Sequence, residues 1–442
     1  MQKLLKNKEV NNASWLIAGR IFQMAISFVV SIIMARFLGP NNYGLINYAT
    51  AYVTFFTSVS NLGINAILVK NFIDSPEKEG EIIGTTLMLR AVSSLLSAIT
   101  IVLIVVVVDA GEMVTIAVVA LASLGLIFHI FETFNYWFQA QYKAKVTAIA
   151  ALVGYTFTAI YKIVLLALKM NVYWFALATS VDYIVIAIIL FAFYKSHKGP
   201  KLTFSFTTGK ALLSKSYHYI LSGMMVAIYG QIDKLMLKHM LNESEVGYYS
   251  IASSICLVWV FVLSAIIDSL RPTIVTLHKS DKEGFKRKNR QLYMLVFYIS
   301  VFVSILFVVF GKQAILILYG KEYLPSVAPL KVVTWYTAFS YLGVARSAWI
   351  VCEDKQKYLK YMYVGAVIIN IALNYLLIPI WGASGAALAS LITEISTSML
   401  LPCFFKDMRP NVKLMVEGIL LKDYRQKIID KIFKGKINRG GN

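Results

Sequence analysis

Apolar runs as long as a membrane is thick recur along this chain. A helix needs about 20 predominantly apolar residues to cross the hydrocarbon core of a bilayer. The chain is 58% apolar and only 15% charged over 442 residues, whereas soluble proteins are roughly a quarter charged. We therefore predict an all-α integral membrane protein without a separate soluble domain, with twelve spans near 14–36, 44–67, 82–108, 113–140, 146–168, 172–194, 216–239, 248–270, 291–318, 325–351, 358–379 and 384–405.

Lysine and arginine are distributed unequally between the two sides of these spans. Of the 43 basic residues, 32 fall in the two terminal segments and the connectors on the same side, while only five fall at the opposite ends. Cytoplasmic loops carry such an excess, which predicts that both termini are cytoplasmic. The net charge of +20 then reflects topology and contact with anionic membrane lipids, and indicates no nucleic-acid partner. The first apolar run reaches full span length without a small-residue cleavage site, so we expect a retained first helix.

A faint internal repeat relates the first six predicted spans to the last six. Leu38 and Gly44 match Leu241 and Gly247 at an offset of 203, and the triplet that begins at Lys78 recurs 204 residues later. Six spans is an even number, so both halves have one orientation, as in parallel repeats with a substrate cavity between two lobes. We predict an N-terminal six-helix lobe over 1–198, a C-terminal six-helix lobe over 199–405 and a basic tail over 406–442.

Two short stretches carry a family resemblance. The sequence from Met34 to Leu45, MARFLGPNNYGL, and the sequence from Asn61 to Asn65, NLGIN, resemble the N-terminal signature of bacterial Wzx-type polysaccharide flippases. These transporters belong to the multidrug/oligosaccharidyl-lipid/polysaccharide exporter superfamily. The resemblance implies a MATE-like V-shaped fold of two six-helix bundles and a bacterial cytoplasmic (inner) membrane location. It also implies an undecaprenyl-diphosphate-linked oligosaccharide as the substrate, and a polysaccharide polymerase with its chain-length machinery as partners.

Six basic residues fall within predicted spans, where an ionised side chain costs roughly 2.5 to 3.5 kcal/mol and usually lines a cavity or forms a pair. Arg90 lies about 12 Å along its helix from the predicted end at Ile82, too deep for its side chain to reach water easily. Arginine suits a diphosphate because its planar fork stays charged and gives two parallel hydrogen bonds. We expect Arg90 to contact the diphosphate, with Arg20 and Arg346 as neighbours and Arg271 at the inner mouth. An alternative is that Arg90 only neutralises a nearby acid such as Glu132.

Polar side chains recur at helical spacing on the first three spans, which predicts that these three helices together form one polar, water-accessible wall of a cavity. The second span contributes an asparagine-rich stripe, from which Asn47, Asn61 and Asn65 are candidate sugar-binding residues. A third stripe comprises Thr86, Arg90, Ser93 and Ser97. The competing interpretation, favoured for individual hydroxyl groups, is that they bond to neighbouring helices or to their own carbonyls.

Two acidic residues, Asp182 and Glu394, fall near the middle of the sixth and twelfth spans. Buried carboxyl groups are candidate proton or sodium sites, so we interpret these two as ion-coupling candidates, against the alternative of helix-to-helix hydrogen bonding. No other cofactor is expected. Nothing in the pattern of the three cysteines predicts a disulfide or a metal site.

The basic tail has an amphipathic pattern. Leu421, Tyr424, Ile428 and Ile432 share one helical face with flanking basic residues, which is typical of a helix lying on an anionic leaflet. A partner-binding role is the weaker alternative.

The leading function is a non-enzymatic flippase for surface polysaccharide such as O-antigen, capsule or exopolysaccharide. The runner-up is a multidrug antiporter for organic cations, although six intramembrane bases outnumber five acids. A membrane glycosyltransferase or polymerase is disfavoured because the outer connectors are short and the chain has no Asp-x-Asp motif. The chain also lacks an ATP-binding phosphate loop.

Overall fold

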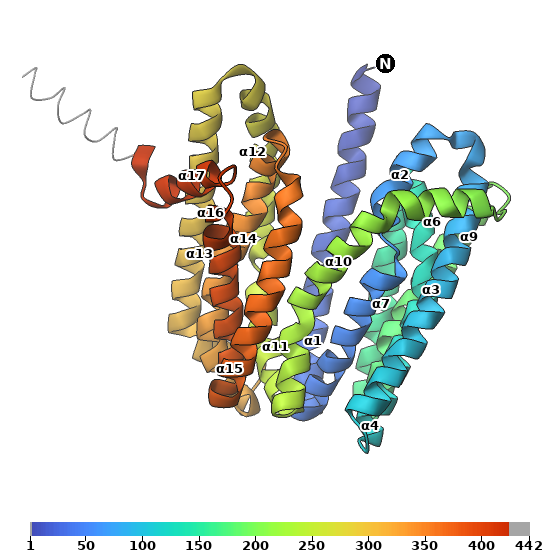
Figure 1. Cartoon of the computed structure of the whole chain (residues 1–442). Coiled ribbons are helices and arrows are strands. Elements are labelled where there is room, and N and C mark those ends of the chain that lie inside the picture. Colours follow the sequence, from blue (N-terminus) through green and yellow to red (C-terminus); the bar gives the residue numbers. More distant parts are fainter. Residues whose placement is uncertain (1, 424–442) are drawn as a thin grey trace, which may run out of the picture. The chain divides into compact units, whose positions relative to one another are not determined.

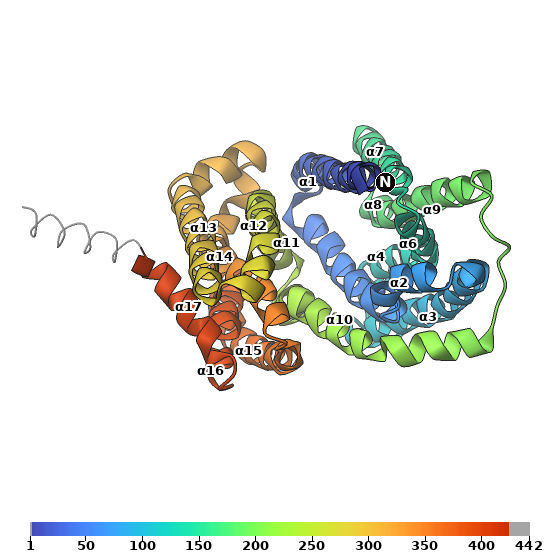
Figure 2. The ribbon, with the colours of Figure 1, turned by 90° about the horizontal axis from the view of Figure 1, so that it is seen from above.

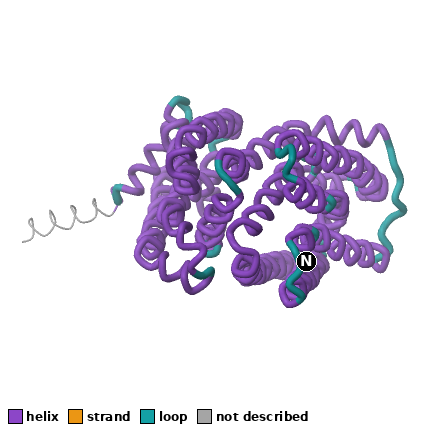
Figure 3. Tube along the Cα trace, turned by 90° about the horizontal axis from the view of Figure 1, so that it is seen from below, coloured by secondary structure: helices purple, strands orange, loops and turns teal. Residues whose placement is uncertain are grey.

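The computed structural model describes residues 2–423, and every regular element in that range is a helix (Figures 1 and 3). The all-α fold predicted from the apolar runs is confirmed. The chain divides into two compact units, one of 1–250 with 318–322 and the other of 251–317 with 323–442. The predicted lobe boundary near residue 198 rests on the repeat and stays a prediction.

Unit 1 contains ten helices and the first half of an eleventh within the described residues. They are α1 (Gln2–Ser60), α2 (Asn65–Asp74), α3 (Glu79–Val108), α4 (Met113–Ser123), α5 (Gly125–His129), α6 (Thr133–Ala140), α7 (Ala144–Ala167), α8 (Val172–Ala176), α9 (Ala178–Ser196), α10 (Phe206–Met240) and α11 (Glu243–Leu257), with short 3₁₀ turns at Pro76–Lys78 and Ile130–Glu132.

Unit 2 takes the rest of α11 and the helices that follow. They are α12 (Val260–Ser280), α13 (Lys282–Leu318), α14 (Val327–Cys352), α15 (Leu359–Ile395), α16 (Leu401–Cys403) and α17 (Arg409–Ile419), with 3₁₀ turns at Lys321–Ser326 and Gln356–Tyr358 and a π-helical turn at Ser396–Leu400. The predicted amphipathic helix of the tail falls mostly on 424–442, outside the described residues.

Nine helical segments in the described chain are long and apolar enough to cross a membrane. Two of them hold two predicted spans each, because each contains two helices that meet at a sharp kink, where Gly39 (φ 70°) and Gly382 (φ 55°) leave helical geometry. Glycine tolerates these positive φ angles because it has no Cβ. The predicted tenth span coincides with α14, a helix of 26 residues that is not among the nine. The chain is therefore a multi-pass membrane protein.

On α3 the exposed face is apolar, whereas the buried face combines small or polar residues with a few large apolar ones such as Ile101 and Val105. On α3, Leu103 and Val107 are exposed, whereas Ser94, Ser97 and Ala98 are buried. An exposed apolar belt suits lipid, and small side chains let neighbouring helices approach closely. In Figure 1, α3 lies beside α4, and the two helices are in contact. The sequence pattern thus gives α3 one face for lipid and one for the protein interior.

The core of unit 2 fixes the position of α17. Leu414 and Met415 of α17 pack with Tyr293 of α13 and with Trp349 of α14. The buried amide of Asn411 also donates a hydrogen bond to the Tyr293 hydroxyl, at 2.7 Å. Figure 2 shows α17 beside these helices. Helix α17 is therefore anchored by packing and by a satisfied polar contact.

Candidate functional site

Arg90 lies in the interior of unit 1 with no exposed surface. Its Nη1 donates a hydrogen bond to the Thr133 hydroxyl at 2.9 Å, and its guanidinium carbon lies 5.9 Å from the centre of the Tyr136 ring. Nε and Nη2 have no hydrogen-bond partner among the described residues. Glu132 interacts with Arg90 electrostatically. The buried guanidinium thus makes one hydrogen bond to a side chain, while its Nε and Nη2 donors remain available to a ligand.

Arg90 belongs to a group of polar residues that we call the Arg90 cluster: Arg90, His129, Glu132, Thr133 and Tyr136. His129 Nε2 lies 3.4 Å from a Glu132 carboxylate oxygen. The inward stripe of α3 that the sequence predicts leads to this cluster, because Thr86, Arg90 and Ser97 are all buried. A buried donor without a partner costs about 1–3 kcal/mol, and more when it is charged. The cluster is therefore suited chemically to receive an anion or a polar ligand.

Arg346 of α14 is buried in unit 2, at the π-helical turn between α15 and α16. Its Nη1 donates to the carbonyl oxygens of Thr397 at 3.3 Å and Ser398 at 3.2 Å. Nε has no partner among the described residues. Glu394 is 7% exposed and interacts electrostatically with Arg346. Two of the predicted functional residues are thus brought together at a π-helical turn, an irregularity that is frequent at functional sites.

The other two arginines differ in their surroundings. Arg271 of α12 is half exposed, lies 3.7 Å from Asp268, and donates to the Ser347 hydroxyl at 3.2 Å. Ser347 follows Arg346 in the chain, so Arg271 contacts the same turn of α14. The backbone of Arg20 lies in α1, but its side chain falls outside the described part of the structure.

The asparagine-rich stripe contributes both bonded and unpaired groups. The Asn47 amide donates to the Tyr43 carbonyl of its own helix at 2.9 Å, as the packing interpretation expects. Asn61 lies in the turn after α1. This turn, with positive φ at Leu62 and Gly63, separates α1 from α2, so the predicted stripe does not run along a single helix. At the start of α2, the side-chain oxygen of Asn65 is buried and has no partner among the described residues. Asn65 is therefore the member of the stripe with unused bonding capacity in the interior.

Asp182 of α9 has partners from one neighbouring helix. The Thr158 hydroxyl of α7 donates to its carboxylate at 3.1 Å, and Lys162 of α7 interacts with it electrostatically. This arrangement is compatible with either alternative left open by the sequence, an ion site or a helix-to-helix hydrogen bond.

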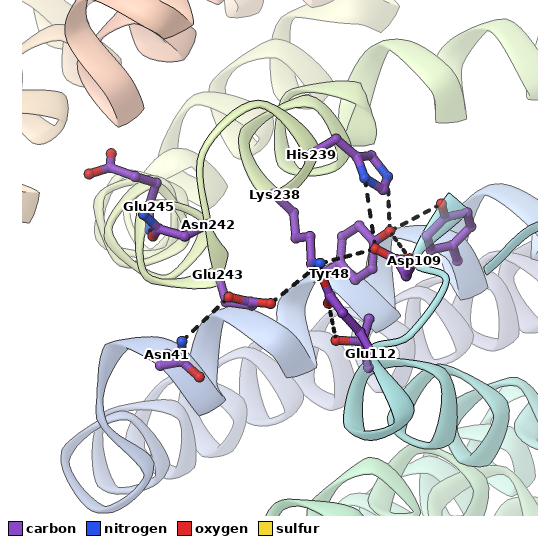
Figure 4. A network of polar contacts seen from close by, with 11 residues as sticks. Asn41, Tyr48, Asp109, Glu112, Lys238, His239, Asn242, Glu243 and Glu245 are labelled. Carbon is purple, nitrogen blue, oxygen red and sulfur yellow. Dashed lines mark hydrogen bonds and ion pairs between the residues drawn. The ribbon is translucent and has the colours of Figure 1, made fainter. Parts of the chain in front are cut away.

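A polar network at the end of α10 was not anticipated from the sequence (Figure 4). Lys238, which is almost fully buried, lies 3.0 Å from Asp109 and 3.4 Å from Glu243, and it also pairs with Glu112. Tyr48 donates to Asp109 at 2.7 Å. The hydrogen bond from Lys238 holds the pKa of Glu112 below its usual value. We call these five residues the Lys238 network.

The sequence did not predict the Lys238 network because its charged residues come from different connectors and follow no common helical spacing. The sequence does contain one indication of it. Lys238 is among the five basic residues at the predicted outer ends, where lysine and arginine are disfavoured, and two connectors on that side carry acids.

The backbones of α1 and α11 meet closely beside this network. A Cβ atom built on Gly44 would overlap the Glu243 carbonyl oxygen and lie 2.9 Å from the Gly247 nitrogen. A Cβ atom on Gly247 would overlap the Pro40 carbonyl oxygen. The Asn41 amide also donates to Glu243 at 3.4 Å. The two glycines that the repeat pairs by sequence therefore permit one helix crossing.

Comparisons with known proteins relate the chain to proteins of polysaccharide biosynthesis and to MatE transporters. A family model described as polysaccharide biosynthesis protein matches residues 10–278, and a MatE model matches 219–376. The chain is 22% identical over 411 residues to the capsular polysaccharide biosynthesis protein CapF of Staphylococcus aureus, which covers 90% of this chain and 99% of that protein.

Solved structures with the same fold include two transporters in inward-facing or inward-closed states. An inward-facing multidrug resistance MATE transporter of the MOP superfamily matches with a TM-score of 0.68 at 14% identity, over 92% of this chain and 96% of that one. The lipid II flippase MurJ in an inward closed conformation matches with a TM-score of 0.66 at 14% identity, over 92% and 91%. The predicted MATE-like fold is confirmed.

Proposed function

Because this chain belongs to the polysaccharide biosynthesis protein family, we propose that it is a flippase for a lipid-linked oligosaccharide. It moves a polyprenyl-diphosphate-linked repeat unit from the cytoplasmic to the outer leaflet of a bacterial cytoplasmic membrane, for assembly of a surface polysaccharide. The similarity to CapF and the fold shared with a lipid II flippase support this proposal. The protein acts as a transporter and not as a catalyst of bond formation.

The observation that carries the proposal is the buried Arg90, whose Nε and Nη2 have no partner among the described residues. A phosphate group accepts paired hydrogen bonds from one guanidinium, and arginine stays charged when water is excluded. Lys would offer a point charge, and Gln would offer none. In the proposal Arg90 binds the diphosphate, and Arg20, Arg271 and Arg346 contact it along its path.

The sugar needs donors and acceptors that are not already used within the protein. Asn65 supplies an unpaired buried oxygen, and Asn61 in the turn before it and Asn47 on α1 are the further proposed sugar contacts. Asp182 and Glu394 are the proposed proton or sodium sites. The membrane potential also favours outward movement of an anionic headgroup, by roughly 2.3 kcal/mol per charge per 100 mV if the charge crosses uncompensated.

A drug antiporter is the second candidate, because the MatE model matches 219–376 and a multidrug transporter shares the fold. An organic cation would need an acid that has no basic partner, whereas Glu132 of the Arg90 cluster interacts with both Arg90 and His129. The loss of surface glycan or the loss of resistance to cationic dyes, after deletion of the gene, separates the two candidates.

The test of the flippase begins with that deletion strain. Lipid extraction and mass spectrometry should find a lipid-linked oligosaccharide accumulated on the cytoplasmic side, and the intact gene should clear it. Complementation with Arg90→Lys should restore part of the transport per folded protein, and Arg90→Gln very little. Full transport by Arg90→Gln would remove Arg90 from the substrate site, and an unchanged lipid profile in the deletion strain would overturn the function.

A further inference from the structure

Unit 2 contains a cavity of about 1050 Å³ where several spanning helices end. Its wall comes from the end of α12, the start of α13, the end of α14 and the segment that leads into α17. These are ends that the charge distribution predicts to be cytoplasmic. The predicted topology would place the cavity at the level of the lipid phosphate groups of the cytoplasmic leaflet.

The lining of this cavity is strongly basic. Eight lysine or arginine residues face four carboxylates. Three of the carboxylates are already paired with lysine: Glu283 with Lys286 at 2.7 Å, Asp407 with Lys355 at 3.2 Å, and Glu417 with Lys422 at 2.7 Å. The fourth, Glu353, lies 3.4 Å from His278.

Four basic residues of the lining form no close ion pair. Lys282, Lys406, Arg409 and Lys413 lie in none of the salt bridges of the described range 2–423. Lys413 interacts with Glu417 only electrostatically, and Arg409 donates to the Cys403 carbonyl oxygen. All four are exposed. The positive charge of the cavity is therefore available to an external anion.

Apolar surface lies next to this charge. Trp349 and Leu414, both largely buried, form part of the wall. A second cavity of about 610 Å³ lies on α17, where Val412 and Val416 join Arg409 and Lys413 in the lining. The same two basic residues thus line both a charged cavity and a largely apolar one.

We propose that the cavity binds the headgroup phosphate of an anionic phospholipid of the cytoplasmic leaflet, with an acyl chain along the neighbouring apolar cavity. A free phosphate would use the charge but not the apolar surface. Basic pockets at the cytoplasmic ends of spanning helices are suited to anionic lipid headgroups. The packing of α17 on α13 and α14 holds the site in place without the lipid. The proposal goes beyond the flippase function and stands whether or not that function holds.

The test measures binding of phosphatidylglycerol to the purified full-length protein in detergent by native mass spectrometry. The triple variant Lys282→Gln, Lys406→Gln, Lys413→Gln removes three unpaired cations from the cavity. The matched control, Lys279→Gln, Arg287→Gln, Lys288→Gln, removes three charges from α12 and α13 outside the lining. Binding should weaken about 10- to 100-fold in the first variant, and less than about threefold in the control.

Two competitors identify the source of the phosphate. Phosphatidylcholine should not displace phosphatidylglycerol, and neither should inorganic pyrophosphate at the same concentration. Displacement by pyrophosphate would overturn the proposal in favour of a free-phosphate site, and displacement by phosphatidylcholine would overturn selectivity for anionic lipid. If phosphatidylglycerol binding weakened equally in both triple variants, the effect would come from the overall charge of the protein. This result would overturn the proposed site.

A single charge-reversal variant tests the site separately from any loss of folding in the triple variant. Lys413 is exposed on α17 and interacts with Glu417 four residues along the helix. Lys413→Glu should therefore lower the thermal unfolding temperature by no more than about 4 °C, while it weakens phosphatidylglycerol binding about tenfold. Lys279→Glu, on the exposed end of α12, should change neither quantity. Unaltered lipid binding in Lys413→Glu would contradict the proposal.

Discussion

Replacement of Lys238 by Met should destabilise unit 1 strongly, because it strands a buried carboxylate. The three acids around Lys238 differ in exposure: the Asp109 side chain is 1% exposed, that of Glu243 19% and that of Glu112 48%. Water can solvate Glu112 after the substitution but cannot reach Asp109. Removing one partner of a buried ion pair costs about 3–5 kcal/mol, whereas an exposed pair contributes at most about 1 kcal/mol.

The magnitude of the effect of Lys238→Met on thermal unfolding follows from the size of unit 1. For a domain of up to about 250 residues, each kcal/mol shifts the unfolding temperature by roughly 2–4 °C, so we expect a loss of roughly 6–20 °C. Met preserves the length and apolar stem of the lysine. Tyr48 still donates to Asp109, which favours the lower part of the range. Unfolding in detergent, followed by fluorescence, measures this temperature.

The double variant Lys238→Met, Asp109→Asn identifies the cause. Without the Asp109 charge there is no stranded carboxylate, so the double variant should recover most of the lost stability. Glu112→Gln is the control and should lower the unfolding temperature by no more than about 4 °C. The reasoning is refuted if Lys238→Met unfolds within about 2 °C of the natural protein, or if Asp109→Asn fails to rescue it.

Three further predictions concern other parts of the molecule. The lowered pKa of Glu112 means that its contribution is complete above its ordinary value of about 4.3 and is lost as the pH falls through the lower folded-state value. The stability difference from Glu112→Gln should follow this course, and a difference independent of pH would contradict it. Asp182→Asn and Glu394→Gln should abolish gradient-dependent transport in vesicles but retain substrate binding; unchanged gradient dependence in both would leave these acids with packing roles. Gly44→Val should force α1 and α11 apart and cost about 1–3 kcal/mol, measured by thermal unfolding, and an unchanged unfolding temperature would refute the close crossing.

Most of the spanning helices could be predicted from sequence because they contain apolar runs of sufficient length, although α14 is not among the nine segments that reach this level of apolarity. The burial of Arg90 followed in the same way, from its distance along one helix and its place in a polar stripe. Both predictions depend on short-range periodicity within a single element.

The contacts of Arg346 and Lys238 could not be obtained in that way. Arg346 binds carbonyl oxygens of a π-helical turn, a backbone irregularity without a compositional signal. Lys238 collects acids from two connectors that are more than a hundred residues apart in sequence. Such groups come together only through tertiary packing, which the period of one helix does not encode.

The contact between Gly44 and Gly247 joins two positions that the predicted internal repeat would make equivalent. If both halves descend from a gene for six spans, its product would have acted as a pair of copies, with this glycine facing itself across a twofold axis. Any substitution of this glycine would have changed both copies at the crossing at the same time. Fusion of two such genes would have let the two sides diverge, so that Lys238 with its acids could arise on one side alone. The asymmetric charges would therefore be younger than the symmetric glycines they adjoin.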